Sequence, residues 1–283
     1  MISKDSKILI VGLGLIGGSY AEGLTDAGYE VGAIDKNIES IDYAISKKII
    51  KHGMINVNRD YIEQFDIIIF ALYPHIFIDW IKKYQSYIKP NTVITDVTGV
   101  KGWLINELDQ ILRKDISFVG AHPMAGREVY GVKNANKKIF NGANYIVTPT
   151  SQSKEEAINI VEEIGHILNF KHIVRLSPQE HDEMIGFLSQ LTHCIAISLM
   201  TCKDSTNLVK FTGDSFRDLT RIAKINEDMW SELFLLNKEE LLKQIDQFMN
   251  QFKLLKKTIE DSNVDEMKEI MRLSTQHRSY FDK

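Results

Sequence analysis

The segment "KILIVGLGLIGGSYAEGLTDAG", residues 7–28, decides the fold of this 283-residue chain. A β-branched apolar run over 7–14 predicts a strand that runs into glycines, and 18–28 predicts a helix. Between them, three glycines follow the spacing G-x-G-x-x-G: Gly12, Gly14 and Gly17. In a strand–turn–helix unit, the first glycine makes the tight turn, the second lets the backbone approach a pyrophosphate, and the third lets helix pack on strand. The segment therefore predicts a dinucleotide site.

The residues around the glycines complete the predicted cofactor site. Leu15 and Ile16 lie between the second and third glycines, where a helix N-terminus offers unpaired N–H groups to an anion. A second strand over 29–35 ends in Asp35, which can accept hydrogen bonds from a ribose 2′-hydroxyl and would repel a 2′-phosphate. This favours NAD, although the neighbouring Lys36 keeps NADP open. The alternative is a glycine turn that binds no nucleotide.

The first half of the chain alternates apolar runs with helical patterns. Strands are also predicted at 65–73, 92–97 and 116–122, and helices at 40–49, 77–88 and 101–112. A helix near 153–169 and strands at 143–150 and 171–177 are expected to extend the same sheet. Because apolar runs without alternation fit a sheet covered on both faces, we predict an α/β fold, with a mostly parallel Rossmann-type sheet, over 1–176.

The second half of the sequence has a different pattern of apolar residues. No strand pattern follows Ser177, and 235–260 has the spacing of a long amphipathic helix that packs in a bundle or against a partner. We therefore predict an all-α domain over 177–283 that serves substrate binding and dimerisation, giving a homodimer.

Composition excludes several classes of function. The net charge is −4 and no dense basic stripe is present, so no nucleic-acid partner is expected. The apolar runs are too short for a membrane span or signal peptide, and the two cysteines, Cys194 and Cys202, suit a reducing cytosol. No metal-ligand spacing occurs. The expected protein is cytoplasmic, without a membrane or metal.

Polar residues follow the predicted strands at the edge where ligands bind in such folds. They are Tyr73, His75, Asp96, Thr98, Lys101 and His122. Pro123 restricts the backbone of His122 to extended conformations, which partly fixes the direction of the ring. A histidine of pKa near 6.5 can take the proton of a hydroxyl, as hydride removal from an alcohol carbon requires. His122 is thus a candidate base; the alternative is a structural cap in a loop.

The helical half holds a second polar group. Gln190 and His193 share a helix face, with His181 before them. Arg217 and Arg221 share another, and an arginine oriented by Asp218 could hold a carboxylate through two hydrogen bonds. The alternatives are interface histidines and a surface Asp–Arg pair. Asn226 is typical of a helix cap, so Trp230 is expected on a new helix.

Five ordered blocks together resemble one family, the prephenate dehydrogenases of tyrosine biosynthesis. They are "VGLGLIGGS", "TDVTGVKG", "GAHPMAGREVYGV", "HDEMIGFLSQLTH" and "FRDLTRIAKINEDMW", from residue 11 to about 230. The resemblance implies oxidative decarboxylation: NAD takes a hydride, the ring carboxylate leaves as carbon dioxide, and prephenate becomes 4-hydroxyphenylpyruvate.

The resemblance also implies roles for the polar residues. His122 would accept the ring hydroxyl's proton, Arg221 would bind a substrate carboxylate, and His193 would lie in the same pocket. His181 and Asp218 would support that pocket. Trp230 would approach it from the partner subunit of a dimer, and Asp96 is expected among the cofactor contacts.

Three positions depart from the family pattern. Gly99 stands where many members have serine, and the adjacent Thr98 is our candidate to supply the hydroxyl. Gln190 replaces a histidine, and Arg127 adds a cation where a small hydroxyl residue is common. The choice between prephenate and arogenate, its amino analogue, stays open. Two further alternatives are a β-hydroxyacid dehydrogenase, whose catalytic lysine pattern is missing around Lys203 and Lys210, and a non-catalytic dinucleotide sensor.

Overall fold

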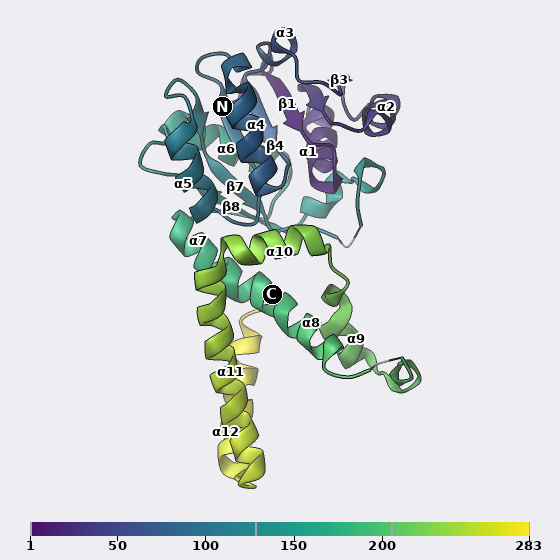
Figure 1. Cartoon of the computed structure of the whole chain (residues 1–283), viewed down its shortest axis with the longest axis vertical. Coiled ribbons are helices and arrows are strands. Elements are labelled where there is room, and N and C mark those ends of the chain that lie inside the picture. Colours follow the sequence, from purple (N-terminus) through teal and green to yellow (C-terminus); the bar gives the residue numbers. More distant parts are fainter. Residues whose placement is uncertain (1, 128, 205, 283) are drawn as a thin grey trace.

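A six-stranded parallel sheet forms the centre of the first half of the chain (Figure 1). The computed structural model describes residues 2–127, 129–204 and 206–282. The strand order is β3-β2-β1-β4-β5-β6. The strands are β1 (Lys7–Val11), β2 (Glu30–Ile34), β3 (His52–Met54), β4 (Ile67–Phe70), β5 (Val93–Asp96) and β6 (Ser117–Phe118). The order reverses between β1 and β4, so the carboxyl ends of these strands flank the crevice in which such folds bind ligands.

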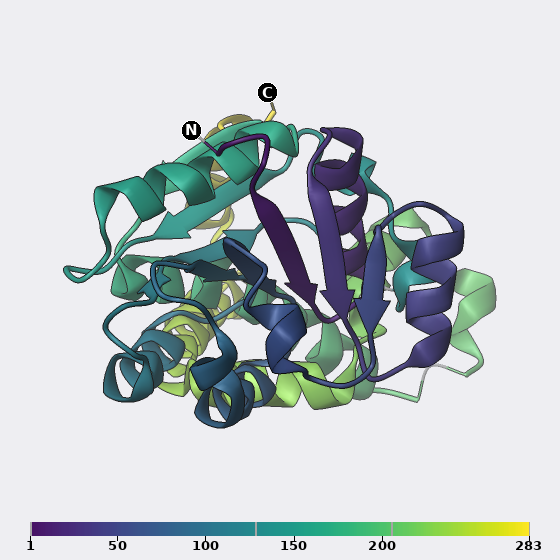
Figure 2. The same ribbon diagram turned by 90° about the horizontal axis from the view of Figure 1, so that it is seen from above.

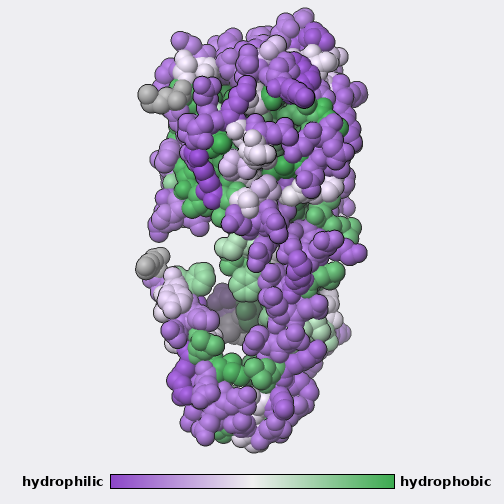
Figure 3. Space-filling view, turned by 90° about the vertical axis from the view of Figure 1, so that its left-hand side faces the viewer, coloured by the Kyte–Doolittle hydropathy of each residue, from purple (hydrophilic) through white to green (hydrophobic). Residues whose placement is uncertain are grey.

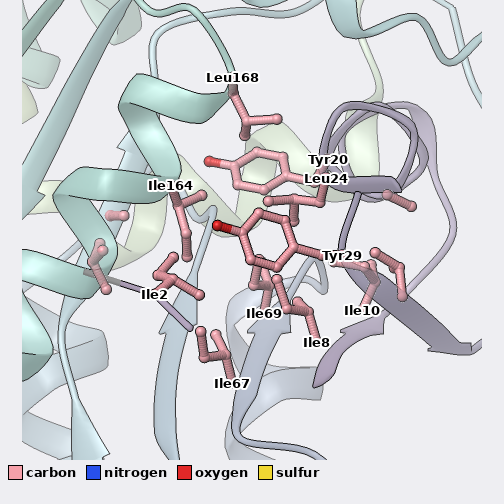
Figure 4. Close-up of a cluster of buried hydrophobic side chains, with 14 of the residues drawn as sticks. Ile2, Ile8, Ile10, Tyr20, Leu24, Tyr29, Ile67, Ile69, Ile164 and Leu168 are labelled. Atoms are coloured by element: carbon pink, nitrogen blue, oxygen red, sulfur yellow. The ribbon is translucent and has the colours of Figure 1, made fainter. Parts of the chain in front are cut away.

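Helices cover both faces of this sheet, which fits the apolar runs in its central strands (Figure 2). Packed on one face are α1 (Leu15–Asp26), α2 (Ile38–Ser46) and α6 (Glu155–Ile167). Packed on the other are α3 (Arg59–Ile62), α4 (Pro74–Tyr84) and α5 (Gly102–Ile111). Figure 4 shows the first core, where Ile8 and Ile10 of β1 meet Tyr20 of α1 and Ile164 of α6. Short 3₁₀ turns lie at Gln85–Tyr87, Val132–Asn134 and Lys137–Phe140.

The prediction that the later strands extend the main sheet is wrong. β7 (Gly120–Pro123), β8 (Asn144–Thr148) and β9 (His172–Arg175) form a separate three-stranded sheet, in which β7 is antiparallel to β8. The predicted strand 116–122 therefore divides, with β6 in one sheet and β7 in the other. It divides because the amide of Ala121 donates to the carboxylate of Asp96 (3.0 Å) and not to a strand carbonyl. His122 thus lies on the second sheet.

The second half of the described chain is helical throughout. Its elements are α7 (Pro178–Ile185), the π-helical η4 (Gly186–Leu191), α8 (Thr192–Thr201), the 3₁₀ turn η5 (Leu208–Phe211), α9 (Asp214–Thr220), the 3₁₀ turn η6 (Arg221–Ala223), α10 (Glu227–Leu236), α11 (Lys238–Glu260) and α12 (Val264–Ser279). Asn226 caps α10 through the amide of Met229, as predicted. The predicted helix 235–260 is interrupted at Asn237, where α10 turns into α11. In Figure 1, α10 lies across the end of the sheet-containing part, and α11 and α12 run away from it.

One continuous helical stretch, Pro178–Thr201, is apolar and long enough to cross a membrane by length and composition alone. Only 28% of its most apolar window is buried within the chain. The stretch begins at a capping box, in which Ser177 and Glu180 bond each other's backbone amides. It contains His181 and His193, so its apolar character and its polar site residues occur on one structural element.

Two glycines of the first turn give opposite expectations for stability. A Cβ at Gly17 would lie 2.0 Å from the carbonyl oxygen of Gly12, whereas a Cβ at Gly14 would meet nothing within 4 Å. We expect Gly17→Ala to lower the free energy of unfolding by about 1–3 kcal/mol, because the added methyl group would overlap the carbonyl of Gly12. Gly14→Ala is expected to cost at most about 1 kcal/mol. Urea denaturation without cofactor measures both, and equal stability of the two variants would contradict the packing argument.

Candidate functional site

The glycine turn forms an anion site at the N-terminus of α1. Gly12 has φ +100°, and a Cβ there would lie 2.5 Å from the carbonyl oxygen of Ala71. Gly14 is the N-cap, with no side-chain cap and no acidic residue on the first turn of α1. The amides of Leu15 and Ile16 therefore face outward without intrahelical partners, as a pyrophosphate requires.

Asp35 lies directly beside this turn. Its Oδ2 accepts a hydrogen bond from the amide of Leu13 (2.6 Å), and its Oδ1 accepts from the amide of Asn37 (2.8 Å). These two bonds fix the carboxylate at the carboxyl end of β2, next to the glycine loop. Together with the open space at Gly14, they fit a dinucleotide whose ribose hydroxyls meet an acidic acceptor.

Asp96 and Thr98 lie in a buried ion-pair network. Asp96 and Lys101 are both fully buried, with Lys101 Nζ 2.7 Å from Asp96 Oδ2. The hydroxyl of Thr98 lies 2.5 Å from the same carboxylate oxygen, and Lys101 also donates to the Thr98 carbonyl (2.7 Å). Burial lowers the pKa of Lys101, and the carboxylate of Asp96 opposes that shift. The structure thus places Asp96 in the interior, bonded to Lys101 and Thr98.

His122 is one end of a hydrogen-bonded chain of three side chains. Its Nδ1 lies 2.9 Å from Nε2 of His181, and Nδ1 of His181 lies 2.7 Å from Oδ1 of Asp182. Asp182 also accepts hydrogen bonds from the amides of Lys101 (2.8 Å) and Gly102 (2.7 Å) at the start of α5. The sequence singled out His122 and His181 but missed Asp182, whose only signal is its place directly after His181.

The surroundings of His122 favour a neutral ring. Burial is the main cause that holds its pKa well below the ordinary value, and the positive charges that His181 and Lys101 can carry act in the same direction. Burial also lowers the pKa of His181, against the opposing effect of Asp182. A neutral histidine is the form that can accept a proton.

Gly99 lies next to the His122 ring and brings no side-chain hydroxyl to it. A Cβ at Gly99 would lie 3.8 Å from Cε1 of His122 and 3.5 Å from a methyl of Leu233, both ordinary contacts. A side chain at position 99 would therefore fit beside the ring. The hydroxyl of Thr98 does not take its place, because it is bound to Asp96.

Helix α10 is fastened across the carboxyl ends of the strands by two polar contacts. Asn226 Nδ2 donates to the hydroxyl of Tyr73 (2.9 Å). Oε1 of Glu232 accepts from the amide of His75 (2.8 Å), at the N-terminus of α4, and lies 2.5 Å from its ring Nδ1. Tyr73 and His75, which the sequence placed at a strand end, thus serve the contact between the two halves. Glu232 had no signal in the sequence.

His193 and Trp230 lie against each other within one chain. Their ring centroids are 3.7 Å apart, and the Nδ1 of His193 lies 2.9 Å from the carbonyl oxygen of Ser189. The resemblance implied that Trp230 reaches the pocket from a partner subunit. Within the described chain, Trp230 lies against its own His193.

Gln190 is buried and engaged at both ends of its amide. Its Nε2 donates to the carbonyl of Leu233 (3.1 Å), and its Oε1 accepts from Nδ2 of Asn237 (2.8 Å). Asn237 also donates to the carbonyl of Asp182 (2.9 Å). The π-helical turn shifts Gln190 off the regular helix face that it was predicted to share with His193. Gln190 fastens α10 and α11 to the π-turn.

The predicted arginine face is not one continuous helix. α9 ends at Thr220 and Arg221 begins the 3₁₀ turn η6, while Arg217 pairs with Asp214 (3.3 Å). The η6 turn packs against α8, which brings Arg221 to the helix that carries His193. Asp218, Arg221 and Arg127 are exposed, and Arg127 lies in the loop after β7. The site thus consists of a base group around His122 and a second group around His193 and Trp230.

Comparison with known proteins identifies this arrangement. The family model for the nucleotide-binding domain of prephenate dehydrogenase matches residues 20–174, and that for its dimerization domain matches 177–273. The chain belongs to the prephenate dehydrogenase family. This confirms the predicted family and the prediction of an NAD-dependent dehydrogenase.

Individual relatives cover nearly the whole chain. Prephenate dehydrogenase from Bacillus subtilis is 30% identical, over 97% of this chain and 76% of its own length. Cyclohexadienyl dehydrogenase from Zymomonas mobilis is 28% identical, over 96% of this chain and 94% of its own. The crystal structure of prephenate dehydrogenase from A. aeolicus, in complex with hydroxyphenyl propionate and NAD+, has a TM-score of 0.90, 31% identity and 99% coverage of both chains.

The comparisons and the fold agree on several predictions. The parallel sheet followed by helices is confirmed, and so is NAD as the cofactor. Within residues 2–127, 129–204 and 206–282, no group of three or more histidine, cysteine or acidic side chains could hold a metal ion.

Proposed function

We propose that this chain oxidises and decarboxylates prephenate to 4-hydroxyphenylpyruvate with NAD, in tyrosine biosynthesis. The observation that carries the proposal is His122, a neutral histidine held by His181 beside the cofactor edge of the sheet. The whole-length similarity to a relative solved with hydroxyphenyl propionate and NAD+ supports it. Arogenate is the second candidate substrate, because one relative is named a cyclohexadienyl dehydrogenase and another a probable arogenate/prephenate dehydrogenase.

The cofactor site is the turn between β1 and α1. Backbone amides of Leu15, Ile16 and Gly17 would hold the pyrophosphate, and Asp35 would hold a ribose. When bound, NAD supplies the acceptor for the hydride that leaves the substrate. Gly12 and Gly14 keep the backbone close to the phosphates, which is a role for residues without side chains.

The reaction requires a base for the ring hydroxyl, and His122 takes that role. Its Nδ1 faces His181, so Nε2 is the nitrogen that remains for the substrate. As the hydroxyl carbon is oxidised, His122 accepts the hydroxyl proton. Loss of the ring carboxylate as carbon dioxide then leaves an aromatic ring.

The second group holds the substrate's other end. Arg221 binds a carboxylate, which a guanidinium does through two hydrogen bonds, and the adjacent rings of His193 and Trp230 form the adjoining wall. Asp218 and Arg127 add opposite charges at the exposed rim. We do not extend the proposal to Asp96, Thr98 and Gln190, whose polar atoms bond to the protein itself: Asp96 and Thr98 to each other and to Lys101, and Gln190 to Leu233 and Asn237.

The division into 1–176 and 177–283 and the assembly as a homodimer are part of the same proposal. Exposed hydrophobic side chains lie on α11 and α12, and Figure 3 shows hydrophobic residues exposed on the helical part. They include Phe248, Met249, Phe252, Ile259, Met271 and Leu273. The apolar stretch Pro178–Thr201, of whose most apolar window only 28% is buried, adds to them. A second copy covering these surfaces would make the chain a soluble cytoplasmic dimer.

The first test is steady-state reduction of NAD with prephenate and with arogenate. We expect turnover with prephenate, and turnover with neither substrate would refute the function.

His122→Asn should lower kcat by several orders of magnitude with little change in KM, because the base acts in the transition state. Arg221→Ala should mainly raise KM. Intact turnover in His122→Asn would exclude it as the base.

The pH dependence follows from the lowered pKa of His122. A histidine with a lowered pKa stays neutral, and therefore active as a base, below its ordinary value of about 6.5. We expect kcat/KM to hold its plateau through neutral pH and to fall only below about 6.5 as the ring takes up a proton. Profiles of kcat/KM against pH measure this. An acid limb with a midpoint above 7 would contradict the predicted direction.

The dimer proposal predicts that a negative charge introduced on α11 dissociates the dimer. Sedimentation should give a dimer for the wild-type chain. Phe252, which is 60% exposed in the single chain, should lie in or near the covered surface, so Phe252→Asp should shift the chain toward monomer. The control is Gln152→Asp, which adds the same charge at an exposed site in the sheet-containing part. A monomeric wild-type chain would exclude the dimer.

A further inference from the structure

The candidate base is assembled across the junction between the two halves of the chain. His122 lies on β7 of the sheet-containing part, whereas His181 and Asp182 lie on α7 of the helical part. Asp182 in turn contacts the start of α5, back in the sheet-containing part. The chain of hydrogen bonds therefore crosses the junction twice and has the same part at both ends.

Two backbone amides and one histidine ring lie within hydrogen-bond distance of the Asp182 carboxylate. Oδ1 accepts from the amide of Lys101, Oδ2 accepts from the amide of Gly102, and the ring of His181 lies 2.7 Å from Oδ1. An ionised carboxylate can only accept, so Nδ1 of His181 must carry the proton. Both amides lie at the N-terminus of α5, from its N-cap Lys101 and its first residue Gly102, where the helix dipole favours the negative charge.

The positions of the other ring protons follow from the proton on Nδ1 of His181. A neutral His181 protonated at Nδ1 has an unprotonated Nε2, which can only accept. The atom 2.9 Å away, Nδ1 of His122, must therefore donate. With its proton at Nδ1, a neutral His122 has its lone pair on Nε2, the nitrogen that the reaction uses.

We propose that Asp182 is a positioning residue for the reaction: it holds His181 in the tautomer that accepts from His122, and so leaves Nε2 of His122 able to accept the substrate's proton. The inference rests on the proposed function for the identity of that proton, but the tautomer itself does not. Because Asp182 also bonds to the start of α5, His122 is held in this tautomer only while the helical part is docked on the sheet-containing part.

The charged groups around the histidine pair are few. Asp182 faces it from α7, Lys101 from the start of α5, and Asp96 from β5; Lys101 and Asp96 neutralise each other at 2.7 Å. Asp182 is thus the anion that balances a proton taken up by the pair. Without it, the pair should hold that proton less well, and the acid limb of the pH profile should move to lower pH.

Glu232 provides a matched control. Like Asp182, it comes from the helical part, accepts from a backbone amide at a helix N-terminus and lies against the Nδ1 of a histidine, His75. It has no hydrogen bond to the His122 chain. Glu232→Gln therefore weakens the same junction in the same way without reaching the base.

The test reads the tautomer directly. Side-chain nitrogen NMR signals of the full-length protein labelled with ¹⁵N-histidine, without cofactor and near neutral pH, distinguish protonated from unprotonated ring nitrogens. We expect His122 and His181 both to be protonated at Nδ1, with assignments from His122→Asn and His181→Asn. A wild-type His122 protonated at Nε2 would overturn the proposal, and this measurement needs no destabilised variant.

Two variants then test Asp182. Asp182→Asn replaces an accepting oxygen by an N–H₂ group that faces other donors. Gly102→Ala puts a Cβ 2.9 Å from Asp182 Oδ2, which displaces the carboxylate without changing its charge. Both should disturb the His122 signals, whereas Glu232→Gln should not. Unchanged His122 signals in both variants, or an equal disturbance in Glu232→Gln, would overturn the proposal.

Kinetics separate positioning from folding. In Asp182→Asn, we expect kcat to fall at least about tenfold while KM for prephenate stays within about twofold, with the acid limb displaced to lower pH. If Glu232→Gln lowered kcat equally and the pH profile of Asp182→Asn did not move, the role of Asp182 would be structural only. If no substrate turns over in the wild type, the proposed function fails, while the NMR result still decides the tautomer.

Discussion

The buried ion pair between Asp96 and Lys101 is the contact on which the site depends. Removing two charges from water costs several kcal/mol per ion, so both must be paired and hydrogen-bonded to be tolerated in the interior. Asp96 meets this condition by accepting from Lys101, from Thr98 and from the amide of Ala121. The same bonds fold the turn after β5 and pull the chain out of the first sheet at β7. His122 points where it does because the residue before it is held by a buried carboxylate.

Much of this fold could be predicted from the sequence because its signals are local. Alternation of apolar runs with helical spacing identified the covered sheet, and three glycines in register identified the cofactor turn. The second sheet could not be predicted, because the break at Val119 depends on a hydrogen bond from Ala121 to a side chain 25 residues earlier. The same limit applies to the surroundings of Asp96, because only the packed structure shows its buried ion pair with Lys101.

The site was predictable where a residue's chemistry and its neighbours sufficed, as for His122, and not where its partner is distant in sequence. Asp182 and Glu232 have ordinary helical neighbours, and their importance comes from α5 and α4, 80 and 157 residues away. Gln190 is the opposite case. Its place in a family block suggested a pocket residue, but the π-turn directs it toward Asn237 and the end of α10. There it bonds to Leu233 and Asn237 at the end of the helix that carries Trp230.

The two halves of the chain are joined by the same physical device used twice. At α4 and at α5, a helix N-terminus of the sheet-containing part receives a carboxylate from the helical part, and each carboxylate also lies against a histidine nitrogen. An uncapped helix N-terminus requires acceptors, and an acid from another element satisfies its amides and its dipole together. Such a contact is directional, since it forms only when the amides face the carboxylate. Docking through helix N-termini therefore fixes orientation as well as distance, and His122 needs both from His181, because a hydrogen bond that sets a tautomer weakens steeply when its donor and acceptor are misaligned.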